Sequence, residues 1–275
     1  MQLFKNFIKT LVDNYIFIGV CSVFFYLSGF LLIHETHMPD YIHISLVFWS
    51  TLTIYYFNTG DNIHIIHLVQ PQSRTSKFKS YIIFILVIIT SIHFFFIPFT
   101  DTIYLSHLGV ISVLYNMPKP ENLKILPLRG IPLLKIFLIA YVWAGIGITF
   151  PALQSGHDIW QPEILKLFAA EFFFILSITL PFDIRDYYSD HIDEPRTLAH
   201  LLGIRHTIAI AIISLGIFTL LIWPFLNTSI FFITFIILVA SLIFYSTPHK
   251  NKYYYTILLD GTMILYYFVL MLTIN

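Results

Sequence analysis

The sequence is dominated by apolar runs that are long enough to cross a lipid bilayer as helices. The run YIIFILVIITSIHFFFIPF, residues 81–99, is one of them, and about 20 apolar residues suffice for a helical span. Hydrophobic residues make up 57% of the 275-residue chain and charged residues 11%, whereas soluble domains contain roughly 45–50% and 25%. Because backbone polar groups in lipid need internal hydrogen bonds, these runs predict an all-α, polytopic membrane protein.

Polar breaks divide the apolar sequence into nine predicted transmembrane helices. They lie near residues 12–33, 41–60, 80–99, 101–116, 131–150, 163–182, 205–223, 228–246 and 254–273. We expect them to form a single integral membrane domain over residues 1–275. The formal net charge is zero, so no bulk electrostatic attraction favours nucleic acid as a partner.

Basic residues occupy alternate connections between the predicted helices. The connections HETHMPD, PFTD, QSGHDIWQPE and WPFLNTS contain no Lys or Arg. The other connections and the N-terminal segment contain Lys5, Lys9, Arg74, Lys77, Lys79, Lys119, Lys124, Arg129, Lys135, Arg185, Arg196, Arg205, Lys250 and Lys252. By the positive-inside rule, this pattern predicts a cytoplasmic N-terminus and an outside C-terminus in an inner or plasma membrane.

Two signals recur at similar spacing and indicate an internal repeat. Tyr-x-x-Pro pairs begin at Tyr115 and Tyr245, 130 residues apart, and the polar helix ends around Asp61 and Asp186 are 125 residues apart. The pattern predicts two four-helix repeats plus one helix, with the first repeat over roughly 12–130 and the rest over 131–275. It places both polar helix ends on the cytoplasmic side. Chance similarity is the alternative, since helices often end before proline.

Charge is concentrated in the stretch PFDIRDYYSDHIDEPRTLAHLLG, residues 181–203. In a continuous helix, Asp183, Asp186, Asp190 and Asp193 have i, i+3, i+7 and i+10 spacing and share one face. Such carboxylates repel one another unless cations neutralise them, and oxygen ligands favour Mg²⁺ or Ca²⁺. The stretch therefore predicts a site for a phosphate head with a long apolar tail; a solvated acidic loop is the alternative.

This stretch resembles the second aspartate motif of the UbiA-type intramembrane prenyltransferases. The family's Asp-x-x-Asp-x-x-x-Asp run corresponds to Asp183, Asp186 and Asp190, and its Thr-Leu and Leu-Gly pairs correspond to residues 197–198 and 202–203. The segments YNMPKPENLK (115–124) and YSTPHK (245–250) resemble the family's Tyr-Ser-x-Pro turns. Nine helices in two repeats with cytoplasmic motif loops also match the family.

The resemblance implies Mg²⁺-dependent transfer of an isoprenyl group from a prenyl diphosphate to a lipid-soluble acceptor within the membrane, with the site facing the cytoplasm. It assigns catalysis and metal binding to Asp183, Asp186 and Asp190. The cations expected to assist on the diphosphate are Arg185, Lys119, Lys124 and Arg129. Each of these cations is also explained by the positive-inside rule alone.

The first aspartate motif departs from the family pattern, which reads Asn-Asp-x-x-Asp-x-x-x-Asp. The corresponding stretch is NTGDNIHII, residues 58–66, in which Asp61 is the only carboxylate. Asn58, Asp61 and Asn62 share a helical face and form a weaker candidate oxygen site for Mg²⁺. A non-catalytic relative that binds a polyprenyl or quinone-like lipid is therefore a second hypothesis. An unrelated transporter or scaffold is a third, although only Glu171 and Asp260 are ionisable groups deep within predicted helices.

Overall fold

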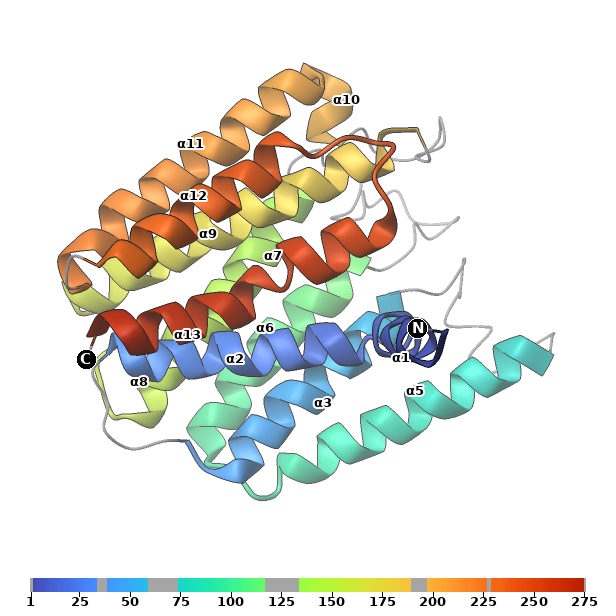
Figure 1. Ribbon diagram of the computed structural model, residues 1–275. Coiled ribbons are helices and arrows are strands. Elements are labelled where there is room, and N and C mark those ends of the chain that lie inside the picture. The colour runs from blue at the N-terminus through green and yellow to red at the C-terminus, as the bar shows by residue number, and fades with distance from the viewer. Residues whose placement is uncertain are drawn as a thin grey trace.

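The computed structural model describes residues 2–33, 39–58, 74–116, 134–188, 197–226 and 229–274, and every regular element in these ranges is helical (Figure 1). The α-helices are α1 (Gln2–Asp13), α2 (Ile16–Leu32), α3 (Tyr41–Asn58), α5 (Arg74–His93), α6 (Phe99–Asn116), α7 (Leu134–Ala144), α8 (Phe150–Gln154), α9 (Pro162–Arg185), α10 (Leu198–Leu202), α11 (Ile204–Ile222), α12 (Ile230–Phe244) and α13 (Thr262–Ile274). A π-helical turn, Gly145–Thr149, joins α7 to α8, and a second one, Tyr254–Leu259, precedes α13. The prediction of an all-helical fold is confirmed for the described residues.

Several of these helices are long and apolar enough to cross a membrane. Four continuous stretches meet this condition, and the bent pair Asn6–Asp13 and Ile16–Leu32 is a fifth if it forms one span. The four are Leu134–Gln154, Pro162–Tyr188, Ile204–Phe225 and Tyr254–Ile274. Each of the nine predicted segments contains a helix, but the described residues give four or five such spans rather than nine.

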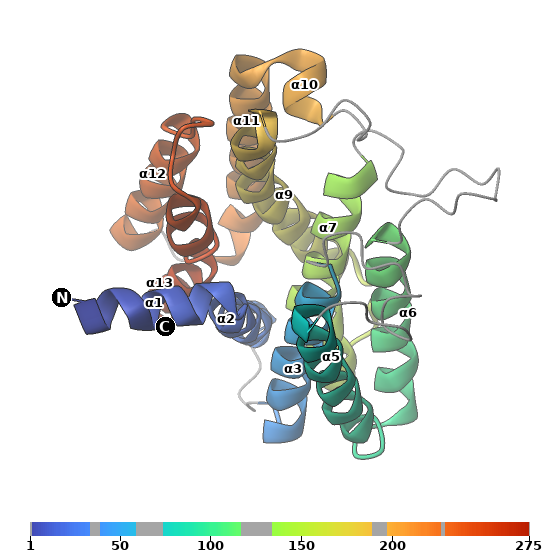
Figure 2. The same cartoon turned by 90° about the vertical axis from the view of Figure 1, so that its right-hand side faces the viewer.

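The helices form a closed ring (Figure 2). Each helix of the ring packs against the next one in the order α2, α3, α6, α7, α9, α11, α12 and α13, and α13 packs against α2. Helix α5 packs on α3. Figure 1 shows the C-terminal end of α9, α10 and the N-terminal ends of α7 and α13 at one end of the bundle (right). We call this the α10 end. The two labelled chain termini lie at opposite ends of the bundle in this view.

The predicted first helix, 12–33, is broken near its start. Tyr15 has a φ of 56°, in the left-handed region, and the helical axis bends there by 69°. Neither Gly nor Pro marks this break, and contacts from α3 accompany it instead: the Tyr56 hydroxyl donates to Asn14 Oδ1 at 2.9 Å, and the Tyr15 ring lies edge-on to the Tyr56 ring at 5.1 Å. The bend therefore depends on tertiary contacts rather than on a local helix breaker.

The bend directs α1 toward the connection between α12 and α13. Lys252 Nζ donates to Asp13 Oδ1 at 2.5 Å, and this hydrogen bond raises the pKa of the exposed Lys252 ammonium. A raised lysine pKa means that the contact stabilises the fold fully below the ordinary lysine pKa and loses its effect as the pH rises through the raised value.

A close backbone approach joins α2 to the π-helical turn Gly145–Thr149. A Cβ atom at Gly29 would lie 1.9 Å from the Gly147 carbonyl oxygen and 2.7 Å from Pro151 Cγ. Glycine is required here because any side chain would meet backbone that cannot rotate away. The π-turn places Gly147 against α2, so the two elements fix each other.

The second half of the ring is packed by aromatic side chains around one buried carboxyl. Glu171 on α9 is 1% exposed, and its Oε1 accepts a 2.6 Å hydrogen bond from the hydroxyl of Tyr266 on α13. The Tyr266 ring contacts Phe174, Phe218 and Phe235, with centroids 5.1–5.7 Å apart. The structure therefore pairs the buried Glu171 carboxyl with a tyrosine hydroxyl on α13.

Candidate functional site

The candidate site is built on the C-terminal end of α9. Pro162 at the first position, Glu163 in the first turn and Arg185 in the last turn suit the start and end of a helix. The α-helix ends at Arg185, and Asp186–Tyr188 form a 3₁₀ turn. The predicted face of four carboxylates requires an α-helix that continues past Arg185. Because α9 ends there, Asp183 and Asp186 have different surroundings.

Asp183 faces the protein interior and holds the neighbouring helix α10. Asp183 is 6% exposed, and its Oδ2 atom accepts a 3.2 Å hydrogen bond from the Leu198 backbone N–H. Leu198 is the first residue of α10. The carboxylate therefore satisfies a donor that the start of a helix leaves unpaired, and it fastens α10 to α9.

Asp186 pairs with its neighbour Arg185 in a two-point contact. Arg185 Nε donates to Asp186 Oδ1 at 2.7 Å, and Nη2 donates to Oδ2 at 2.9 Å. Both side chains are 32% exposed. Charge-assisted, bidentate pairs of this kind are short and well oriented, so the pair presents a fixed polar surface at the end of α9.

Aromatic rings support the Arg185 guanidinium. Its Cζ atom lies 5.0 Å from the centroid of the Phe182 ring and 5.9 Å from that of Tyr255. Tyr255 belongs to the π-helical turn before α13, and its hydroxyl donates to the Thr247 carbonyl at 2.7 Å. Asp260, directly after that turn, interacts electrostatically with Arg185. Rings from two elements thus hold a guanidinium that pairs with Asp186.

Histidines cover the outer side of the 3₁₀ turn. The His200 ring stacks on Tyr187 at 4.7 Å, with Nε2 2.7 Å from the Tyr187 carbonyl and Nδ1 2.8 Å from Thr197 Oγ1. His249 stacks on Tyr188 at 5.7 Å. These contacts hold the turn that carries Asp186, and they give His200 a structural role.

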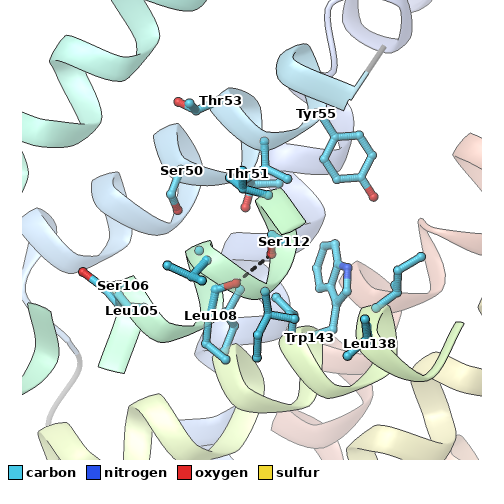
Figure 3. Close-up of a pocket in the computed structure, with 18 of the residues that line it drawn as sticks. Ser50, Thr51, Thr53, Tyr55, Leu105, Ser106, Leu108, Ser112, Leu138 and Trp143 are labelled. Atoms are coloured by element: carbon cyan, nitrogen blue, oxygen red, sulfur yellow. Dashed lines mark hydrogen bonds between the residues drawn. The ribbon is translucent and has the colours of Figure 1, made fainter. Parts of the chain in front are cut away.

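A cavity of about 900 Å³ opens beside this end of α9 (Figure 3). Residues of α3, α6 and α7 form most of its wall, and Arg185 belongs to that wall. The apolar lining includes Leu46, Leu105, Leu108, Leu138 and Trp143. Cavities of 300–1,000 Å³ commonly bury small ligands. The apolar chamber is thus large enough for a ligand, and the Arg185 guanidinium lies in its wall.

Polar groups also line the chamber. Hydroxyl side chains come from α3, at Ser50, Thr51 and Tyr55, and from α6, at Ser112, and the Lys135 ammonium group comes from the first turn of α7. Figure 3 shows Ser50 and Thr51 pointing from α3 toward the α6 residues. The chamber is therefore mainly apolar, with hydroxyls from more than one helix and cations at Lys135 and Arg185.

The structure describes only part of the predicted site. It pairs Asp186 with Arg185, which lines the chamber, and it places Asp183 against α10. Asn58 is the last residue of α3, and Tyr55, one turn earlier, lines the chamber. The other predicted residues lie outside the described ranges: Asp61, Asn62, Lys119, Lys124, Arg129 and Asp190.

The oxygen ligands that the described residues offer to a metal are few. No three His, Cys, Asp or Glu side chains come together as a metal site within the described ranges. Asp186, a partly exposed carboxylate beside the chamber, suits Mg²⁺, which is often held by one or two carboxylates together with substrate phosphates. The donor chemistry therefore fits Mg²⁺ through Asp186.

Sequence reasoning missed the residues that line the chamber. The sequence predicts Lys135 only as one of several positive-inside residues, and it places the hydroxyls of α3 within an apolar span. A signal was present, because Ser45, Ser50, Thr51 and Thr53 interrupt an otherwise apolar helix. Tyr255 was missed because a π-helical turn, which shifts the helical phase, brings it to Arg185.

The fold resembles that of a solved membrane protein. A digeranylgeranylglyceryl phosphate synthase structure superimposes with a TM-score of 0.57 and 15% sequence identity, over 100% of this chain and 99% of that chain. No family model and no curated protein matches the sequence. At this identity the likeness establishes the fold, and together with the apolar helices it supports an integral membrane protein.

Proposed function

We propose that this protein transfers an isoprenyl group from a prenyl diphosphate to a lipid-soluble acceptor within the membrane. The observation that carries the proposal is that the Arg185 guanidinium, which pairs with Asp186, belongs to the wall of the mainly apolar chamber. A prenyl diphosphate has the same division, with a charged head and a hydrocarbon tail. The fold likeness to a synthase of a prenylated lipid, and the resemblance of residues 181–203 to the second aspartate motif, support the same proposal.

In this proposal, Asp186 and Asp190 hold Mg²⁺ on the diphosphate, with Asn58, Asp61 and Asn62 as weaker oxygen ligands. When bound, Mg²⁺ stabilises the negative charge that develops on the leaving diphosphate. Arg185, Lys119, Lys124 and Arg129 are the cations proposed for the same diphosphate. Asp183 acts by fixing α10 beside α9.

The protein's own residues supply orientation and exclusion of water. The bond from prenyl C1 to the diphosphate oxygen breaks, a bond from C1 to the acceptor forms, and the acceptor loses a proton. Arg185 is held by Asp186 and the Phe182 ring, so its charge is oriented before substrate arrives. The apolar wall limits water that competes with the acceptor for the allylic carbon.

The nine-span architecture and its orientation are part of the proposal. The closed ring contains α3 and the shorter apolar helices Phe99–Leu114 and Ile230–Phe244 beside the four or five longer spans. A third shorter helix, Phe78–His93, packs on α3. The positive-inside pattern puts the α10 end in the cytoplasm, where a water-soluble diphosphate head is accessible.

The deciding experiment is binding of a fluorescent allylic prenyl diphosphate to the purified protein, with Mg²⁺ and with EDTA. We expect Mg²⁺-dependent binding, loss of that binding in Asp186→Ala, and no change in Glu163→Ala. Glu163 is an exposed acid at the other end of the same helix, so it controls for the general effect of removing a charge from α9. Metal-independent binding that Asp186→Ala leaves intact would sink the proposal.

A transfer assay separates an enzyme from a lipid-binding relative. The sparse first motif, with Asp61 as its only carboxylate, favours the second candidate. Labelled prenyl diphosphate incubated with mixed lipid acceptors should yield a labelled lipid if the chain is a transferase. Tight Mg²⁺-dependent binding without product would identify the non-catalytic relative.

A further inference from the structure

The helix α1 has two chemically opposite faces. From Asn6 to Asp13, the polar residues have i, i+3, i+4 and i+7 spacing and share one face of the helix: Asn6, Lys9, Thr10 and Asp13. The apolar residues between them share the opposite face: Phe7, Ile8, Leu11 and Val12. Lysine on the polar face, with phenylalanine and leucine on the other, is typical of helices that lie in a membrane surface.

In the described part of the chain, protein covers one end of the apolar face of α1 and leaves the other end open. Val12, beside the bend into α2, is 7% exposed, whereas Phe7, more than one turn nearer the N-terminus, is 60% exposed. Helix α1 packs against α2, and Lys252 holds its last residue, Asp13. Burial of the open Phe7 ring in an apolar environment would therefore stabilise this position of α1.

The direction of α1 suits a helix that lies in the plane of a membrane. Helix α2 has 17 residues without a charged side chain, enough for a short span, and such spans are tilted on average by about 20° from the membrane normal. The axis of α1 is bent by 69° from that of α2. Figure 1 shows α1 end-on at the α10 end while α2 runs across the view, and Figure 2 shows α1 lengthwise with α2 foreshortened. With α2 as a span, α1 lies closer to the membrane plane than to its normal.

Tyrosine rings and lysines gather where α1 joins the bundle. The Tyr15 ring, at the bend, lies 5.9 Å from the Tyr55 ring and 5.1 Å from the Tyr56 ring. The ammonium group of Lys252 lies 5.3 Å from the centroid of the Tyr253 ring. Tyrosine is enriched at the depth of the lipid head groups, and lysine extends its charge to the same depth. The bend therefore indicates head-group depth, where the open apolar face of α1 meets lipid.

Lys9 gives the polar face of α1 a charge that the described protein does not neutralise. Its side chain is exposed, and no ion pair among the described residues includes it. Asp13, on the same face, is compensated by Lys252 at 2.5 Å. In the sequence, Lys5 precedes Lys9 by four residues. Cations at a cytoplasmic membrane surface are attracted by anionic lipids, so the charge of this face suits such a surface.

We propose that α1 is an interfacial anchor that binds the anionic lipid surface at the α10 end of the bundle, with Phe7 among the acyl chains and Lys9 at the lipid phosphates. The cover of the apolar face is lipid rather than a second copy of the chain, because the bend and the tyrosine rings put this face at head-group depth. No residue of α1 belongs to the described chamber wall, so the anchor is independent of the proposed transfer reaction.

The first measurement tests depth in the full-length protein, reconstituted in lipid nanodiscs that hold one copy each. An NBD fluorophore is attached to Phe7→Cys on the apolar face and, as the matched control, to Thr10→Cys on the exposed polar face. Cys21 is fully buried and can stay in place. We expect blue-shifted emission at position 7, with stronger quenching by lipids that carry an acyl-chain nitroxide than by aqueous iodide. Position 10 should show the reverse.

The second measurement tests charge. Hydrogen exchange over residues 2–13 is compared between discs of phosphatidylcholine and discs that also contain about 30% phosphatidylglycerol. We expect the anionic lipid to slow exchange and high salt to remove this effect. Lys9→Gln should remove roughly fivefold of the protection, as the loss of one cation at an anionic surface implies. The control Lys79→Gln neutralises an exposed lysine on α5 and should leave exchange in α1 unchanged.

Three results would overturn the inference in variants that thermal unfolding shows to be folded. If iodide quenches position 7 as strongly as position 10, α1 lies in water. Equal exchange in the two lipid compositions, unchanged by Lys9→Gln, would remove the role of anionic lipid. Protection that appears only in discs holding two copies would assign the apolar face to a second copy of the chain. A failure to bind prenyl diphosphate would contradict the proposed function and leave these readouts unaffected.

Discussion

Gly29 shows how one missing side chain sets the distance between two elements. Its position allows α2 to approach the Gly147 carbonyl so closely that a Cβ atom would lie 1.9 Å from the oxygen. We expect Gly29→Ala to lower the free energy of unfolding by about 1–3 kcal/mol, because the clash is with backbone and needs a shift of a whole helix. The measurement is the thermal unfolding midpoint in a fixed detergent.

Gly216 on α11 provides the matched control. A Cβ atom there meets nothing within 4 Å, and alanine is a better helix former than glycine. Gly216→Ala should therefore leave the midpoint unchanged or raise it. Equal midpoints for the two alanine variants would show that the approach of α2 to the π-turn does not limit stability.

Glu171 and Tyr266 form a buried pair whose members depend on each other. Glu171 Oε2 has no hydrogen-bond partner among the described residues, so the Tyr266 hydroxyl on Oε1 is the contact that compensates the carboxyl. We expect Tyr266→Phe to lower the free energy of unfolding by about 1–3 kcal/mol, because it leaves a buried polar group unpaired.

A double-mutant cycle tests this dependence. Replacing both partners, with Glu171→Met and Tyr266→Phe, removes the unpaired group and should recover much of the loss, since apolar replacement of both partners is often nearly neutral. Detergent unfolding of the two single variants and the double variant gives the coupling energy. Additive losses would mean that the hydrogen bond contributes nothing specific.

The behaviour of Asp183 and Asp186 shows where sequence reasoning about residues stops. Their i, i+3 spacing places them on one face only while the helix continues, and α9 ends between them, at Arg185. The end of the helix turns Asp183 toward the Leu198 N–H and leaves Asp186 with Arg185. The contacts of the two aspartates therefore depend on the end of α9 and on the backbone of α10, which residue spacing does not contain.

At the scale of elements, α10 has only five residues and depends on α9 for its position. Its first N–H group, at Leu198, donates to Asp183 Oδ2. We expect Asp183→Ala to free this end and to increase hydrogen exchange over residues 198–202 more than elsewhere, with a loss of about 0.5–2 kcal/mol in local stability, as for a lost helix cap. Hydrogen-exchange mass spectrometry in detergent measures this directly.

Asp183→Asn is the control for this element, because the amide keeps an oxygen acceptor for Leu198. Protection of α10 should then stay close to wild type. If both substitutions raise exchange equally, charge rather than the hydrogen bond fixes α10. If neither does, packing of Leu198 and Ala199, which are both buried, is sufficient to hold the helix.

The positions of the helices were predictable because each one follows an apolar run bounded by polar residues. The predicted helices 41–60, 163–182 and 205–223 correspond to α3, α9 and α11 within a few residues. The bend at Tyr15 and the two π-helical turns were not predicted. Contacts from distant elements accompany them, such as Tyr56 on Asn14, and hydropathy along one helix carries no information about such contacts.

At the scale of the whole molecule, the ring closes where α13 packs against α2. This contact closes the ring of helices that Figure 2 shows. Three helices of that ring, α3, α6 and α7, form most of the chamber wall. The Lys and Arg pattern predicts which end of that wall faces the cytoplasm, and two exposed positions at opposite ends test the prediction.

Gln161 precedes α9 and Thr247 lies between α12 and α13; both are exposed, and Figure 1 shows these connections at opposite ends of the bundle. The native Cys21 is fully buried, so it can remain in place as a silent background. In intact cells, a membrane-impermeant maleimide should label Gln161→Cys, whereas Thr247→Cys should react only after permeabilisation. The wild type should stay unlabelled in both conditions. Labelling of Thr247→Cys from outside, with protection of Gln161→Cys, would invert the orientation and place the Arg185–Asp186 pair on the outer side, away from a cytoplasmic diphosphate.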